Sequence, residues 1–104
     1  MVNQVALIGK IISFDKQGNN YSIWLEVERP TKDEHGRITS MQICCVAWRG
    51  VAESVQRYYK VGDVIAVGGR LDISHDTTLH VIAETTHILY RGQLKKEVLL
   101  EQQE

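Results

Sequence analysis

The chain has 104 residues, of which 43% are hydrophobic and 24% are charged, and its formal net charge is −1. This length and composition predict one globular domain with a thin core, and the longest apolar runs are too short to cross a membrane. The balanced charge excludes a strongly basic overall field, although a local basic patch would be enough for nucleic-acid binding.

Two strands are predicted at the start of the chain. β-Branched residues over 5–12 predict a first strand that continues toward Phe14, and the polar DKQGNN that follows predicts a turn. In YSIWLEVERP (residues 21–30), apolar and polar side chains alternate. Successive side chains of a strand point to opposite faces, so Trp24 falls on the face away from the predicted core.

A polar loop over residues 31–37 separates these strands from a third, which is predicted over 38–48. One face of the third strand carries Ile43, Cys45 and Ala47, and the other carries Gln42, Cys44, Val46 and Trp48. A second tryptophan therefore ends the strand on the face opposite its apolar residues.

Cys44 and Cys45 are the only cysteines of the chain. As neighbours on a strand they point to opposite faces and cannot easily bridge each other, so we expect two reduced, structural thiols. The amino-terminal residues also lack the basic and apolar regions of a secretory signal. Both observations predict a cytoplasmic protein without a membrane partner.

The period of the apolar pattern changes after Trp48. In GVAESVQRYY (residues 50–59), apolar residues recur at helical spacing, which predicts a helix of about three turns. Gly62 is the expected end of this element. Tyr58 and Tyr59 are interpreted as contacts between the helix and the sheet.

Alternation returns in the last part of the chain, with strands predicted over 64–73 and 79–90 and a tight hairpin, SHDTT, between them. Gly68 and Gly69 predict a sharp bend. The apolar residues expected to share one face of the fourth strand are Ile65, Val67, Leu71 and Ile73. Residues 91–104 are expected to form a short tail that is helical or disordered.

The order of three strands, one helix and two strands predicts an all-β fold. It is the pattern of an OB-fold, a five-stranded, partly open Greek-key barrel, here over residues 1–90. A small α+β sandwich also fits the pattern but is less economical.

Particular residues carry a resemblance to a known family. NQVALIGK at the start, LEVERP at the end of the second strand, and VIAETTHIL near the end resemble bacterial single-stranded DNA-binding proteins. The central ICCVAWRGVAESVQRYYKVGDVIAVGGRL resembles the strand–helix–strand centre of the same family. The resemblance covers roughly residues 1 to 90, and the order and spacing of these segments make it fairly specific.

The resemblance implies a non-catalytic, nucleoid-associated protein that coats single-stranded DNA in replication, recombination or repair. It also implies a homo-oligomer, in which first strands pair to give dimers that assemble into a tetramer. The chain departs from the family at Thr31, Gln42 and Asp76, where aromatic residues are common, and it ends in LLEQQE in place of a long tail with an acidic, phenylalanine-tipped peptide. Recruitment of replication or recombination proteins is therefore not carried over from the family.

Binding a single strand requires aromatic platforms for bases and cations for phosphates. Trp24 and Trp48 are the candidate platforms, because the outer face of strands two and three is the usual binding surface of an OB-fold. The candidate phosphate contacts are Lys10, Arg29, Lys32, Arg37, Arg49 and Arg70. No metal site, cofactor or nucleophile–base motif is predicted, and the four histidines lack ligand spacing.

Two other interpretations stay open. The chain could be a primosomal accessory protein of the same fold. It could also be an OB-fold protein-interaction module that has lost DNA binding, with Trp24 in a protein interface, where aromatic residues are enriched. Glu26 and Glu28 flank Trp24 and would repel phosphate, which favours the interaction module; Trp48 and the basic residues favour DNA.

Overall fold

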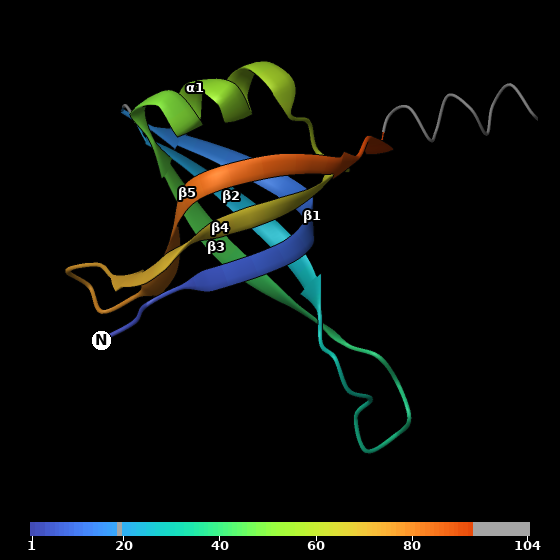
Figure 1. Ribbon diagram of the computed structural model, residues 1–104. Coiled ribbons are helices and arrows are strands. Elements are labelled where there is room, and N and C mark those ends of the chain that lie inside the picture. The colour runs from blue at the N-terminus through green and yellow to red at the C-terminus, as the bar shows by residue number, and fades with distance from the viewer. Residues whose placement is uncertain (19, 93–104) are drawn as a thin grey trace, which may run out of the picture.

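Five strands close into one barrel, and a single helix separates the third strand from the fourth (Figure 1). The computed structural model describes residues 1–18 and 20–92, so most of the predicted tail, residues 93–104, lies outside the described residues. The elements are β1 (Val5–Gln17), β2 (Asn20–Glu28), β3 (Ser40–Trp48), α1 (Arg49–Tyr58), β4 (Val64–Ile73) and β5 (Leu79–Tyr90). The predicted order of elements is confirmed.

Closure of the barrel depends on β1, which pairs with two strands in succession. Val5–Lys10 pairs with β4, and Lys10–Gln17 pairs with β2. The register of the second pairing shifts between Ile11 and Ser13, so Ile12 is an extra residue that bends the strand. The sheet order is β1-β2-β3-β5-β4, and among these described strand pairs only β3 and β5 run parallel. The barrel is therefore closed, where the sequence predicted a partly open one.

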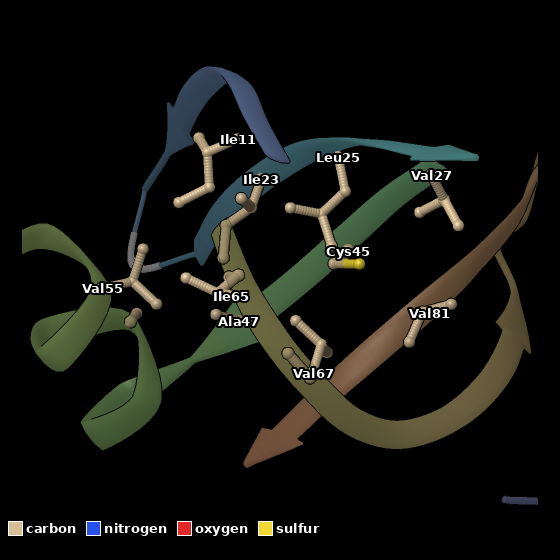
Figure 2. Packing of buried hydrophobic residues seen from close by; sticks show 12 residues of the cluster. Ile11, Ile23, Leu25, Val27, Cys45, Ala47, Val55, Ile65, Val67 and Val81 are labelled. Atoms are coloured by element: carbon tan, nitrogen blue, oxygen red, sulfur yellow. The ribbon is translucent and has the colours of Figure 1, made fainter. Parts of the chain in front are cut away.

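The core follows the alternation of β2. Ile23 and Leu25 are fully buried inside the barrel, and Val27 is nearly so. The helix α1 lies across one end of the barrel (Figure 1) and directs Val55 towards the buried side chains, as Figure 2 shows. Amphipathic burial of this kind is the main source of stability for a short helix. Within residues 1–18 and 20–92, the structure contains no helix long and apolar enough to cross a membrane.

The two tyrosines at the end of the helix behave differently. Tyr59 packs against the core and its hydroxyl donates a hydrogen bond to Oγ1 of Thr86 at 3.0 Å, as expected of a contact between the helix region and the sheet. Tyr58 is exposed, so the prediction that it packs on the barrel is wrong. It is the last residue of α1, and Tyr59 already has extended backbone angles, which places the two side chains on different sides of the chain.

Leu71 and Ile73 keep the alternation that was predicted for β4, but both are exposed, so this face is buried only at Ile65 and Val67. β4 pairs with β1 only as far as Gly69. Beyond that residue β4 is paired with β5 alone, and the hairpin that these two strands form projects from the barrel (Figure 1). The alternation persists there, but no opposing strand is present to cover the apolar face.

Asp63 is the one buried charged residue in the part of the chain that the structure describes, with 1% of its surface exposed. Its carboxylate accepts hydrogen bonds from the backbone N–H of Lys60 at 2.9 Å and of Gly92 at 3.1 Å. Nη1 of Arg91 lies 3.5 Å from Oδ2 of the same carboxylate, and the backbone of Asp63 accepts from the N–H of Ile11 at 2.9 Å. This residue therefore joins β1, the turn before β4 and the end of β5.

Candidate nucleic-acid interface

Both tryptophans lie on the outer face of β2 and β3. The antiparallel register places Trp24 opposite Cys44 and Trp48 opposite Asn20. Trp24 is 36% exposed and Trp48 is 42% exposed. Because Trp48 is opposite Asn20, the two tryptophans are four residue steps apart along β2, which corresponds to about 13 Å. The structure therefore presents two separate aromatic side chains on the outer face of β2 and β3, as the sequence predicted. This surface is called the strip below.

The negative charge beside Trp24 is partly balanced by a lysine of β1. Glu26 is directly opposite Lys10 in the pairing of β1 with β2, and opposite Gln42 in the pairing of β2 with β3. Opposite charges in directly facing positions of a sheet attract each other. Glu28, two residues further along β2, is exposed. Lys10 thus offsets one of the two carboxylates that would repel a phosphate near Trp24.

The two cysteines have different environments, as predicted from their adjacency. Cys45 is fully buried in the core, and burial raises its pKa to about 12. Cys44 is half-buried on the outer face; burial raises its pKa, opposed by a hydrogen bond with Ser22 and assisted by the charge of Asp15. Neither thiol is activated as a nucleophile at neutral pH. The free thiols agree with a structural role.

Trp48 stands at the end of the strip nearest the helix, together with two of the basic candidates. Arg49 follows it in the chain and begins α1 with a φ of 49°. Cζ of Arg70, on β4, lies 5.9 Å from the centroid of the Trp48 ring, within the range of a cation–π interaction. Nη1 of the same arginine is 2.9 Å from Oε2 of Glu84 on β5.

The other end of the strip leads into the loop between β2 and β3, which extends away from the barrel (Figure 1). Arg29 crosses the base of this loop and donates from Nη1 to Oγ1 of Thr39 at 3.0 Å and to the carbonyl of Ser40 at 2.9 Å. Lys32 and Arg37 are exposed in the loop itself. The loop tip is ordered by Oδ1 of Asp33, which accepts from the backbone N–H of His35 and of Arg37, each at 2.9 Å.

The structure therefore separates the predicted residues into three groups along β2, β3 and the loop that joins them. The helix end holds Trp48, Arg49 and Arg70; the middle holds Trp24 and Lys10; the loop end holds Arg29, Lys32 and Arg37. Glu84 is a member of the helix-end group that sequence reasoning missed. Its position depends on a register shift between β4 and β5, for which the sequence offers only the paired glycines at 68 and 69 as a signal.

No cluster that could hold a metal ion is present among the described residues of the protein. The positions where the resemblance leads one to expect aromatic residues are polar here. Gln42 lies on the strip opposite Glu26, and Thr31 is in the exposed loop. Asp76 is in the β4–β5 turn, where hydrogen bonds from Ser74 and Thr78 hold its pKa below the usual value. The two tryptophans are thus the aromatic side chains available on this strip.

Comparison with known proteins gives one family for most of the chain. The model of the single-strand binding protein family matches residues 2–89. A single-stranded DNA-binding protein of Oceanobacillus iheyensis is 32% identical in an alignment of 79 residues that covers 68% of this chain and 48% of that protein. The chain therefore spans about half the length of the curated relatives it matches.

Solved structures share the same fold. A small single-stranded DNA-binding protein from Streptomyces coelicolor superposes with a TM-score of 0.65 at 20% identity, covering 86% of this chain and 95% of that chain. A small single-stranded DNA-binding protein from Mycoplasma pneumoniae gives a TM-score of 0.69 at 18% identity, covering 84% and 93%. Together with the five-stranded barrel and the position of the helix, these similarities confirm the predicted OB-fold.

Proposed function

Because the chain belongs to the single-strand binding protein family, we propose that it binds single-stranded DNA without catalysis. Bases stack on Trp24 and Trp48, and the basic groups at the two ends of the strip contact phosphates. The observation that carries this proposal is the exposure of both tryptophans on the same outer face of β2 and β3. A stacked base contributes about 1–3 kcal/mol by alanine substitution, and stacking is tolerant of base sequence.

The candidate phosphate contacts gather at the two ends of the strip, at one of which Arg70 is already paired with Glu84. Arg49 and Arg70 lie near Trp48, and Arg29, Lys32 and Arg37 lie near the loop. In the middle, the charge of Lys10 is opposed by Glu26. Phosphate contacts make affinity fall with salt concentration. We therefore expect salt-dependent binding of modest slope, with Trp24 as a stacking platform that has little cationic support.

Titration with oligo-dT, followed by tryptophan fluorescence at two salt concentrations, tests the proposal. We expect strong quenching, weaker affinity at the higher salt, and loss of much of the quenching in Trp48→Ala. Tyr58→Ala is the matched control, because Tyr58 is an exposed aromatic residue on α1 outside the strip. A fluorescence spectrum that stays unchanged up to high micromolar DNA would show that the protein does not bind single strands in this way.

The protein-interaction module is the second candidate, and one observation favours it. Trp24 is flanked on β2 by Glu26 and Glu28, and only the first of these faces a cation across the strand pair. If Trp24 belongs to a protein interface, Trp24→Ala will leave DNA affinity and quenching of Trp48 unchanged. If it stacks, the same substitution weakens DNA binding by about five- to 150-fold.

The family and the proposed activity suggest where the protein works. We propose that it coats single-stranded DNA in the cytoplasm during replication, recombination or repair, as a DNA-binding protein and not an enzyme. A primosomal accessory role is the narrower form of the same proposal. Deletion of the gene in its host, followed by measurement of sensitivity to DNA damage and of replication-fork progress, separates a general role from a primosomal one.

We further propose that the protein is a homo-oligomer whose β1 strands pair. Among the described strand pairs, Val5–Gly9 is bonded to β4 on one edge only, since pairing with β2 starts at Lys10. This half of β1 carries no charge, and Ile8 is 61% exposed on it. Unprotected edges of this kind invite pairing with another chain.

Molar mass in solution, measured by light scattering, tests this arrangement. We expect a dimer or tetramer for the native chain and a smaller species for Ile8→Lys, because an edge lysine opposes strand pairing. Ile73→Lys is the matched control, since Ile73 has the same exposed fraction, 61%, on the β4–β5 hairpin. A monomeric native protein would contradict the proposal.

A further inference from the structure

Arg70 is held between a carboxylate and an aromatic ring that belong to two other strands. Its guanidinium is 2.9 Å from Oε2 of Glu84 on β5, and its Cζ is 5.9 Å from the ring centroid of Trp48 on β3. Because β5 lies between β3 and β4 in the sheet, the arginine side chain must cross β5 to reach the tryptophan. The three side chains therefore form one cluster on the outer face, here called the Arg70 cluster.

The backbone fixes the geometry of this cluster. Gly68 pairs with Thr85 and Gly69 with Ala83, so Glu84 is an extra residue of β5 that has no partner on β4. A Cβ added at Gly69 would lie 1.8 Å from the carbonyl oxygen of Ile82, so the close approach of the strands needs glycine there. Bulges of this kind redirect side chains. Here the bulge brings the carboxylate of Glu84 to the arginine.

Ile82 lies between Arg70 and β3 on the outer face of the sheet. It is paired with Val46 of β3 and with Arg70 of β4, yet only 3% of it is exposed. Because Cζ of Arg70 is 5.9 Å from the Trp48 ring, the arginine side chain extends from β4 across β5 towards β3 on this face. The guanidinium of Arg70 therefore lies next to Trp48, the proposed stacking platform.

We propose that Glu84 competes with a DNA phosphate for the guanidinium of Arg70. In the free protein it holds the guanidinium beside Trp48, and it yields the guanidinium to a backbone phosphate when a base stacks on that ring. This inference rests on the proposed binding of single-stranded DNA. Carboxylate and phosphate use the same planar fork of donors, so they compete for it directly.

The exposure of the pair makes such an exchange feasible. The side chains of Arg70 and Glu84 are 40% and 53% exposed, and ion pairs in such positions contribute little net free energy. A phosphate that is delivered by a strand already stacked on Trp48 has a high local concentration and can displace the carboxylate. Glu84 therefore weakens binding of free anions and of short strands at this end of the strip.

A double-mutant cycle with Arg70→Gln and Glu84→Gln, using oligo-dT over a range of salt concentrations, tests the proposal. We expect Glu84→Gln to tighten binding by about two- to fivefold, because it frees the guanidinium. Arg70→Gln should weaken binding and lower the slope of log affinity against log salt by about 1, because one phosphate contact is lost. In the Arg70→Gln background, the gain from Glu84→Gln should disappear.

Glu28→Gln is the matched control, because it removes one negative charge from the outer face of β2 at the other end of the strip. It should have the same effect with and without Arg70. An equal gain from Glu84→Gln in both backgrounds would overturn the proposal, as would weaker binding by Glu84→Gln at an unchanged melting temperature. A salt slope that is unchanged in Arg70→Gln would show that the arginine stays with Glu84 in the complex, which also overturns it. Failure of the native protein to bind oligo-dT would instead overturn the proposed function itself.

Discussion

Cys44 and Cys45 show how one step along a strand changes the chemistry of a side chain. Cys45 points into the barrel, where desolvation disfavours its thiolate, whereas Cys44 lies across from Trp24 on the outer face. The same alternation accounts for Trp24, which is exposed because Ile23 and Leu25 fill the core on either side of it. At this scale, the face on which a residue lies decides both its burial and its reactivity.

The raised pKa of Cys45 predicts how stability depends on pH. The unfolded thiol ionises near the ordinary value of 9.0, and the folded one only near 12, so the folded state holds an extra proton between these values. The free energy of unfolding should therefore be unaffected below pH 9.0 and fall as the pH rises from 9.0 toward 12. Urea unfolding at pH 8 and pH 10 measures this loss. Cys45→Ala should lose less stability over the same interval, and an equal loss in both proteins would refute the prediction.

At the scale of elements, glycines decide where the barrel strands bend. Gly69 permits the close approach of β4 to the bulge in β5, and Gly9 permits β1 to pass close to β2, where a Cβ would lie 2.8 Å from the carbonyl oxygen of Glu26. Gly50, in the first turn of α1, has open space around it. Two kinds of glycine are thus present, and only the first is required by packing.

This difference predicts opposite effects of one substitution. Gly69→Ala should lower the free energy of unfolding by about 3 kcal/mol or more, because strand backbones must separate to admit the methyl group. Gly50→Ala should raise it by up to about 1 kcal/mol, since alanine is the better helix former. Chemical denaturation of the three proteins makes the comparison. A Gly69→Ala variant as stable as the native protein would show that the bulge does not need glycine.

At the scale of the whole molecule, Asp63 links parts of the chain that are far apart in sequence. Its carboxylate binds the backbone of Lys60 and Gly92, and Arg91 also donates a hydrogen bond to the carbonyl of Tyr58. The start of β4, the end of β5 and the end of α1 are therefore tied at one point. The Asp63 carboxylate is buried and its hydrogen bonds to Lys60 and Gly92 are part-buried, so loss of this acceptor leaves two backbone donors poorly satisfied.

We expect Asp63→Ala to lower the free energy of unfolding by about 2–4 kcal/mol, because two backbone N–H groups lose their acceptor in a buried site. Asp33→Ala is the matched control. Asp33 also accepts two backbone N–H groups, those of His35 and Arg37, but in an exposed loop where water replaces the carboxylate. Its loss should therefore be well under that of Asp63. Equal effects of the two substitutions in urea unfolding would contradict this explanation.

Local pattern was enough to predict the elements and the faces of the central strands. The alternation around Trp24 and in the strand that ends at Trp48 is set by residues within a few positions, because a strand has a period of two. The same holds for the helix, in which Ala52 and Val55 are buried as its period requires. The pattern did not predict that Leu71 and Ile73 are exposed, because the alternation continues into a hairpin that lies outside the core.

The sequence by itself therefore determined the order of the elements, the OB-fold and the outer position of both tryptophans. Only the tertiary structure decided what surrounds them: that Lys10 faces Glu26, and that Arg70 lies between Glu84 and Trp48. These contacts join residues from different strands, and a one-residue bulge changes which side chains meet. Strand pairing and register are set by the closure of the whole barrel, so no short segment of the sequence contains them.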